Sequence, residues 1–123
     1  MNKIAFIFSK SPYGNIINKE GIDIILSISS FTEDIALFFI GDGILQIYSK
    51  QNTKNFLLNN YNISLNILKF CNINNYYICS ESLKTLGIEK NNKKNNWMLP
   101  IKIIHPLIWK KKINNYDIII NFN

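Results

Sequence analysis

The chain has 123 residues, of which 47% are hydrophobic and 18% are charged, so it can form one domain that buries roughly 65% of its unfolded surface. This composition is that of a globular protein slightly poor in charge, and it leaves enough neutral or apolar surface to favour permanent partners. The formal net charge of +6 comes from lysines alone, and the lack of arginine, which reads phosphates and bases in bidentate fashion, argues against a nucleic-acid-binding protein.

The expected cellular location follows from the apolar stretches and the two cysteines. The apolar runs are far shorter than the ~20 residues that span a bilayer, and the N-terminal run reads as a strand rather than as a signal peptide. Cys71 and Cys79 are too far apart for a C-x-x-C redox or zinc motif. We therefore expect a cytoplasmic protein with reduced cysteines and with neither a metal ion nor a cofactor.

The first half of the chain predicts a β-α-β unit. Residues Lys3 to Ser9 form an almost continuous apolar run, which is typical of a strand buried on both faces. From Asn15 to Phe31, isoleucines recur at helical spacing, and Gly21 lies beside this apolar face, where it would let the helix approach the sheet closely. A second buried strand, Ile35 to Ile40, ends at Gly41-Asp42-Gly43, which we interpret as a turn that needs a positive φ.

The second half continues the alternation of strands and helices. The expected elements are a short apolar piece at 44–48, one or two helices at 56–70, a strand with a short helix at 76–87, an exposed loop at 90–96, a short strand at 101–104, a helix at 105–112 and a last strand at 116–122. Such alternation predicts an α/β fold with a parallel sheet that has helices on both faces. We find no internal repeat and no domain boundary.

The candidate functional residue is Cys79. The stretch from Tyr76 to Cys79 reads as a strand, a polar Ser80-Glu81-Ser82 turn follows, and a short helix then ends at Gly87. Sites in open α/β sheets lie at the carboxyl ends of strands, where the next helix presents free N–H groups that favour a thiolate. The charge of Glu81 opposes this effect. Cys79 is therefore either a reactive thiol or a small packed residue at a strand end.

The other candidate residues have structural interpretations. His105 could in principle act as a general base, but no acidic residue or serine accompanies it in a recognisable arrangement. Gly41-Asp42-Gly43 resembles a phosphate-binding turn, yet it matches neither a P-loop nor G-x-G-x-x-G. Lys110-Lys111-Lys112 suits a helix C-terminus, with a patch that faces a nucleic acid as the alternative, and Cys71 is expected to be a packing residue in the core or at the surface. We expect the large aromatic residues to lie in the core or at an interface, namely Phe38, Phe39, Tyr76, Tyr77, Trp97 and Trp109.

Several short segments, in a specific order and spacing, carry a resemblance to a known family over essentially the whole chain. They are the first strand with the turn Ser9 to Gly14, Glu20-Gly21-Ile22-Asp23, the run from Ala36 to Gln46, Ile78-Cys79, Ser82-Leu83, Gly87-Ile88 and Tyr116-Asp117-Ile118-Ile119. Together they resemble the DsrE/DsrF/DsrH group of sulfur-relay proteins, and within it the DsrF/TusC family.

The resemblance implies a three-layer α/β/α fold with a five-stranded parallel sheet, in a single domain over residues 1–123. It also implies a cytoplasmic heterohexamer in which TusB-like and TusD-like subunits are the direct partners, while TusA-like and TusE-like sulfur carriers act by way of the complex. Such a complex passes persulfide sulfur toward 2-thiouridine at the tRNA wobble position. The sulfur-carrying cysteine belongs to the D-type subunit, at the strand end that Cys79 occupies here. Ser80-Glu81-Ser82 and Lys84-Thr85-Leu86 depart from the D-type pattern.

Two functions therefore stay open at this point. In the first, the chain is an accessory subunit that holds the D-type partner and has no activity alone. In the second, it is itself a thiol sulfurtransferase that uses Cys79 as a persulfide carrier. A small nucleotide-binding domain is a third, weaker alternative, and we expect no membrane contact and no direct nucleic-acid binding.

Overall fold

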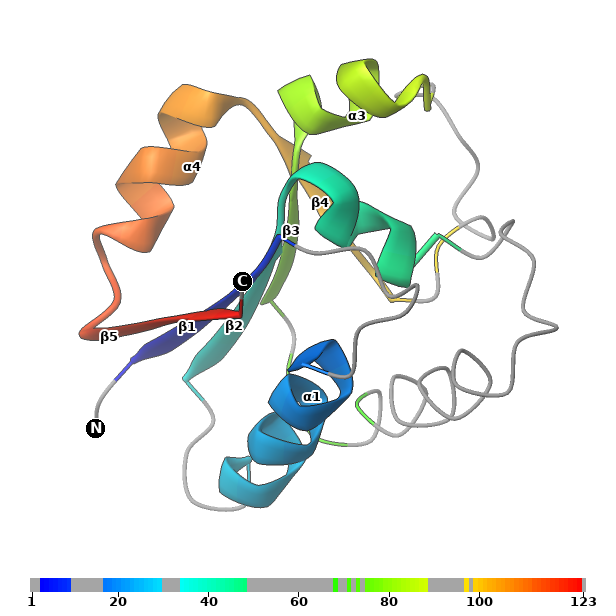
Figure 1. The fold of residues 1–123 in the computed structure, drawn as a ribbon. Helices are drawn as coiled ribbons and strands as arrows, with labels where there is room; N and C mark the ends of the chain where they lie inside the picture. The colour runs from blue at the N-terminus through cyan, green and yellow to red at the C-terminus, as the bar shows by residue number, and fades with distance from the viewer. Residues whose placement is uncertain are drawn as a thin grey trace, which may run out of the picture.

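The computed structural model describes residues 3–9, 17–29, 34–48, 68, 71, 73, 75–88, 97 and 99–122. Within these residues, a twisted sheet runs through the middle of the molecule and helices lie on either side of it (Figure 1). The predicted helices over 56–70, apart from Leu68, the predicted loop over 90–96 and most of the predicted turn from Ser9 to Gly14 lie outside the described residues.

Five parallel strands form one sheet in the order β4-β3-β2-β1-β5. The strands are β1 (Ile4–Phe8), β2 (Ile35–Phe39), β3 (Asn75–Cys79), β4 (Lys102–Ile104) and β5 (Ile118–Phe122). The central strand β2 is buried at every residue, which explains why its sequence is a continuous apolar run. The predicted α/β fold with a five-stranded parallel sheet is thus confirmed.

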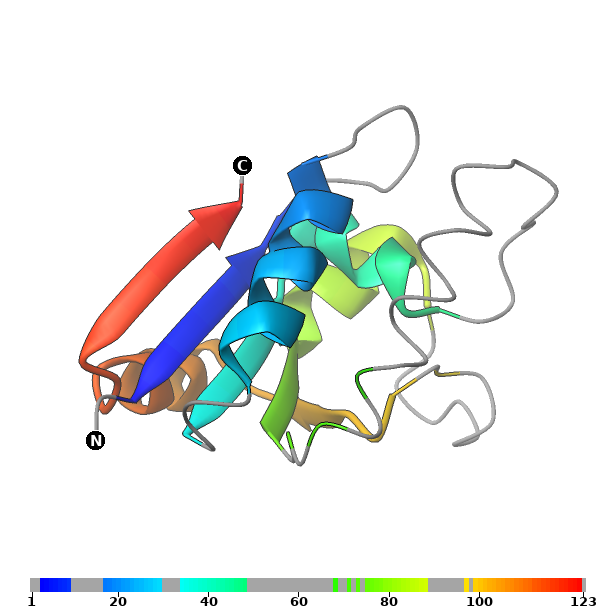
Figure 2. The same cartoon turned by 90° about the horizontal axis from the view of Figure 1, so that it is seen from below.

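Helices cover both faces of the sheet, also as predicted (Figures 1 and 2). They are α1 (Ile17–Ile28), the 3₁₀-helix η1 (Gly41–Gln46), α3 (Ser80–Leu86) and α4 (Pro106–Ile113). Residues of α1, η1 and α3 belong to the core on one face of the sheet, and residues of α4 belong to the core on the other face. These two sides are called the α1 face and the α4 face.

Two local expectations differ from the structure. Ser80-Glu81-Ser82 is not a turn before the helix but its first helical turn, and Cys79, whose backbone is extended, is the N-cap. The segment from Gly41 onward continues as η1, because the N–H of Gly43 donates to the carbonyl of Ile40 at 3.0 Å, three residues earlier. The helix after Cys79 does end at Gly87, in a left-handed conformation, as the sequence predicts.

Stacked aromatic rings hold the core of the α1 face together. The ring of Phe8 lies 5.3 Å from that of Phe39 and 5.0 Å from that of Phe122, and Phe6 stacks on Phe122 at 5.9 Å, all measured between centroids. These contacts join β2, β1 and β5 across the sheet, and each such pair adds about 0.5–1.5 kcal/mol beyond its buried area. Tyr76 belongs to the same core and is only 1% exposed.

Phe38 occupies the centre of the smaller core on the α4 face. Its ring contacts Trp109 of α4 at 4.9 Å, Tyr77 of β3 at 5.0 Å and Tyr116 at 5.8 Å between centroids. The edge-on geometry with Trp109 and Tyr116 is favourable because ring edges are positive and ring faces are negative. All six aromatic residues expected to be core or interface are buried.

The 3₁₀-helix η1 packs so closely on the carboxyl end of β1 that Gly43 has no room for a side chain. A Cβ atom on Gly43 would lie 2.1 Å from the carbonyl oxygen of Phe8, which is a backbone atom and cannot turn away. Gly41 has a φ of 56°, so the predicted positive φ is confirmed there. Gly21 allows the predicted close approach, since its Cβ would lie 3.0 Å from the rings of Phe8 and Phe122.

We predict that Gly43→Ala lowers the free energy of unfolding by about 3 kcal/mol, at the upper end of overpacking effects, because η1 must move away from β1. Urea denaturation of the two proteins measures the loss. Gly87→Ala is the control, because it meets no atom within 4 Å and should cost only about 1 kcal/mol for its left-handed backbone. Equal losses in the two variants would show that the close approach at Gly43 is not a constraint.

Two tyrosines link the stability of the fold to alkaline pH. Burial, and then the neighbouring Cys71, raise the pKa of Tyr76 to about 12. Burial, followed by Tyr77 and Asp34, raises the pKa of Tyr116 to about 12. Folding therefore favours the neutral phenols. Their contribution to the free energy of unfolding is fully present below pH 10, the ordinary pKa of a tyrosine. It is lost as the pH rises toward 12, the pKa in the folded protein.

We predict that these two tyrosines keep the free energy of unfolding steady as the pH approaches about 10 and lower it between about pH 10 and 12. Urea denaturation at each pH measures the change. Tyr76→Phe should flatten part of this fall. At pH 7 it should be neutral or stabilising by up to about 1 kcal/mol, because the Tyr76 hydroxyl has no hydrogen-bond partner among the described residues. A large loss of stability at pH 7 would contradict this interpretation.

Candidate functional site

Cys79 lies where the sequence places it, at the last residue of β3 on the carboxyl edge of the sheet. The segments that follow β2 and β3 meet at this edge. The N–H of Gly41, which begins η1, donates to the hydroxyl oxygen of Ser82 in the first turn of α3 at 2.9 Å. This bond ties the first turn of α3, directly after Cys79, to the segment that follows the neighbouring strand β2.

The side chain of Cys79 is packed rather than open to solvent. Only 5% of the residue is exposed, and it belongs to the core of the α4 face together with Tyr77, Ile104 and Trp109. The thiol makes no capping hydrogen bond to α3, although Cys79 is the N-cap residue. A thiol reacts as its thiolate and needs an open approach, so this arrangement suits a structural cysteine better than a nucleophile. Its role as a persulfide carrier stays a prediction.

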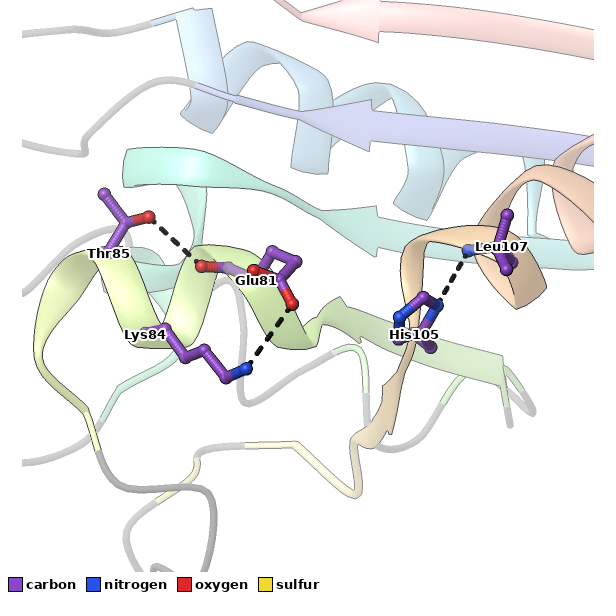
Figure 3. Close-up of polar contacts among 5 residues, drawn as sticks. All are labelled: Glu81, Lys84, Thr85, His105 and Leu107. Atoms are coloured by element: carbon purple, nitrogen blue, oxygen red, sulfur yellow. Dashed lines mark hydrogen bonds and ion pairs between the residues drawn. The ribbon is translucent and has the colours of Figure 1, made fainter.

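The charge on the first turn of α3 lies on the outer surface. The Glu81 carboxylate pairs with the Lys84 ammonium at 3.6 Å, and the Thr85 hydroxyl donates to the Glu81 carbonyl at 3.1 Å (Figure 3). Both charged side chains are more than half exposed, so the pair contributes less than about 1 kcal/mol to stability. The pair does offset part of the negative charge that Glu81 brings to the helix start.

His105 has a structural role at the start of α4. Its Nδ1 atom accepts a hydrogen bond from the N–H of Leu107 at 3.2 Å, and Pro106 occupies the first helical turn (Figure 3). This contact requires the tautomer that carries its proton on Nε2. His105 follows Ile104, which pairs with Cys79 in the sheet register, so the histidine and the cysteine share one edge. Use of Nδ1 as a general base would break the helix cap.

Two of the three amides of Gly41-Asp42-Gly43 are already hydrogen-bonded within the protein. The N–H of Gly41 is bonded to Ser82, and the N–H of Gly43 is bonded to the carbonyl of Ile40. A phosphate-binding turn needs several free N–H groups that point into one space. The structural interpretation of this glycine pair is therefore the better one.

Lysines 110 to 112 complete the last turn of α4, as predicted, and one of them borders a polar pocket. The Lys112 ammonium lies 4.9 Å from the centroid of the Tyr77 ring. The Tyr77 hydroxyl in turn donates to the Asn75 side chain at 3.4 Å. The pocket holds about 150 Å³ and is lined by Lys3, Asp34, Asn75, Tyr77, Lys112, Asn115 and Tyr116.

This pocket lies at the amino ends of β1, β2 and β3, so it is at the opposite edge of the sheet from Cys79. The pocket could not be recognised from the sequence, because its residues come from separate element ends that only the strand order brings together. Among the described residues that line it there is no cysteine.

Within the ranges given above, no group of three or more His, Cys, Asp or Glu side chains is placed to hold a metal ion. Among the helices of the described part of the chain, none is both long and apolar enough to span a membrane.

Comparison with known proteins agrees with this geometry. The sequence pattern of the DsrE/DsrF-like family matches residues 2–122. The chain is 42% identical over 122 residues to Protein TusC of Buchnera aphidicola subsp. Schizaphis graminum, and equally so to Protein TusC of the subspecies Acyrthosiphon pisum (strain Tuc7); each match covers 99% of this chain and 100% of the relative. The crystal structure of the Escherichia coli ychN protein has the same fold, with a TM-score of 0.77 at 18% identity over 99% of this chain and 100% of that one. The chain therefore belongs to the DsrE/DsrF-like family.

Proposed function

We propose that this protein is a subunit of a sulfur-relay complex that passes persulfide sulfur toward 2-thiolation of the tRNA wobble uridine. Its direct partners are TusB-like and TusD-like subunits in a cytoplasmic heterohexamer, and TusA-like and TusE-like carriers bring and remove the sulfur. Within the complex this chain is an accessory subunit that supports the D-type partner. Its similarity to relatives named TusC over the full length supports the proposal.

The burial of Cys79 is the observation that carries the accessory role. Sulfur transfer requires an acceptor thiolate to attack the outer sulfur of a persulfide, so that one S–S bond forms, the donor S–S bond breaks and the donor sulfur leaves as a thiolate. The attacking sulfur must reach its target in line. With 5% of Cys79 exposed, and with Trp109 and Ile104 in the same core, a carrier protein has no open approach to this thiol.

A second candidate function is that Cys79 itself carries the sulfur. The observation that favours it is the position of this cysteine at the N-cap of α3, on the carboxyl edge of the sheet. In this case α4 or α3 would have to open locally during transfer. The two functions differ in whether the complex works without the Cys79 thiol.

We predict that Cys79→Ser and Cys79→Ala leave sulfur delivery within about twofold of the unmodified complex, because the thiol takes no part in the transfer. The chain is co-expressed with its TusB-like and TusD-like partners, and labelled persulfide sulfur is followed from the TusA-like to the TusE-like carrier. Size-exclusion chromatography verifies that each variant assembles. If delivery stops in both variants while assembly is intact, Cys79 is a relay residue and the accessory role is wrong.

We also predict that iodoacetamide modifies Cys79 at least roughly tenfold more slowly in the native chain than in urea, because alkylation requires local opening of the core. Mass spectrometry of the peptides separates Cys79 from Cys71, which is more exposed and serves as the internal control. Equal rates for Cys79 in the native and the unfolded chain would favour the second candidate function.

A further inference from the structure

The two edges of the sheet are built differently. β4 has three residues and carries exposed Lys102, and both features discourage pairing with another chain. β5 has five residues and no charged side chain, and Ile118 and Ile119 are 39% and 42% exposed. Natural proteins rarely leave such an edge bare, because its free backbone groups and apolar side chains are a template for another strand.

The outer backbone groups of β5 belong to two residues. The N–H of Ile118 donates to the Lys3 carbonyl beside β1 at 3.1 Å. Because N–H and C=O groups point to alternate sides along a strand, Ile119 and Asn121 present theirs outward. No strand of the described residues pairs with this side of β5.

Apolar side chains flank this edge on both faces. Phe122 packs on Phe6 and Phe8, so Ile118 and Ile120, which share its side of the strand, point to the α1 face, and Ile119 points to the α4 face. Helix α1 packs beside β5 and carries a further exposed isoleucine, Ile24. Three of the five exposed large apolar residues of the described chain therefore lie on β5 or on the helix next to it.

We propose that β5 is a dimerisation edge, on which β5 of a second copy of this chain pairs in antiparallel orientation about a twofold axis at Ile120. In this register Ile119 lies opposite Asn121 of the other copy, so both outward residues exchange two backbone hydrogen bonds with each other. Ile118 lies opposite Phe122 of the other copy on the α1 face, so these two apolar side chains contact each other. This register pairs all five residues, and the two five-stranded sheets become one.

Charge is compatible with a second copy as the occupant. β5 itself carries no charged side chain, so no like charges face each other across the paired strands. Each chain has a net charge of +6, but at physiological salt the repulsion between distant charges is screened over roughly 8 Å. Two five-residue strands form a small contact, smaller than the ~800 Å² per partner of a standard interface, so the dimer is expected to be weak and to dissociate on dilution.

The test is sedimentation velocity of the full chain alone, at physiological salt, from about 1 to 200 μM, the range in which a weak dimer forms and dissociates. The mean mass should rise from that of the monomer toward that of the dimer. Ile119→Lys should hold the chain monomeric, whereas Leu107→Lys, at the most exposed apolar residue, on α4 and away from β5, should leave the dimer unchanged. A chain that stays monomeric throughout, or an equal effect of both variants, would overturn the proposal.

Cross-linking tests the register itself. Residues opposite each other in a pair without hydrogen bonds have Cα atoms about 4.5 Å apart, within the range that a disulfide spans. Two chains with Ile120→Cys should therefore form a disulfide under mild oxidation, and two chains with Ile118→Cys should not, because that residue faces Phe122. The reverse pattern would overturn the register.

The same variants distinguish this inference from the proposed function. If the chain is monomeric alone but Ile119→Lys abolishes assembly with the TusB-like and TusD-like subunits, the edge receives another subunit, and the second copy is the wrong occupant. If the dimer forms as described and no sulfur is relayed by the assembled complex, the dimer stands and the relay function fails.

Discussion

The carboxyl edge of the sheet depends on one close contact, between the backbone of Phe8 and Gly43. The 3₁₀-helix η1 can lie directly on the end of β1 only because Gly43 has no side chain. From there, η1 reaches α3 through the hydrogen bond between the Gly41 N–H and the Ser82 hydroxyl. The ends of three neighbouring strands are thus fixed relative to one another by two short-range contacts, and Cys79 lies within the region that they fix.

The tight packing at this edge limits the access of a reactant to the Cys79 thiol. The face of Cys79 that a reacting sulfur would have to approach belongs to a core that Trp109 and Ile104 share. Trp109 is held there by its contact with Phe38 at the centre of the sheet, and α4 is positioned further by the cap that His105 provides. Exposure of the thiol would therefore disturb an aromatic contact and a helix start together. A cysteine that is this costly to expose is poorly suited to exchange sulfur repeatedly.

Most of the fold could be predicted from the sequence, because the buried strands are continuous apolar runs and the helices have clear ends. Pro106 after His105 marks the start of α4, and Gly87 marks the end of α3. The carboxyl edge was also predictable, since Cys79 directly follows a buried strand. By contrast, the 3₁₀ geometry of η1 was missed, because Gly-x-Gly after a strand is equally typical of a turn.

The surroundings of Cys79 could not be predicted, because they depend on long-range packing. Nothing near Cys79 in the sequence indicates that Trp109, thirty residues later, would share its core; that follows from the position of β4 beside β3 and from the return of the chain over the α4 face. The pocket at the opposite edge was missed for the same reason, as Asp34, Asn75 and Asn115 become neighbours only through the strand order.

The strand order also explains why β5 differs from the other strands. The chain runs outward from β1 through β2 and β3 to β4, and then returns to place its last strand on the free side of β1. β5 therefore packs Phe122 against Phe6 and Phe8 on one side and has no described strand on the other. Its apolar sequence, Ile118-Ile119-Ile120-Asn121-Phe122, would suit an interior strand. Because Ile118 and Ile119 are exposed at an edge, burying them against another strand would remove apolar surface from water and pair the outward backbone groups of β5.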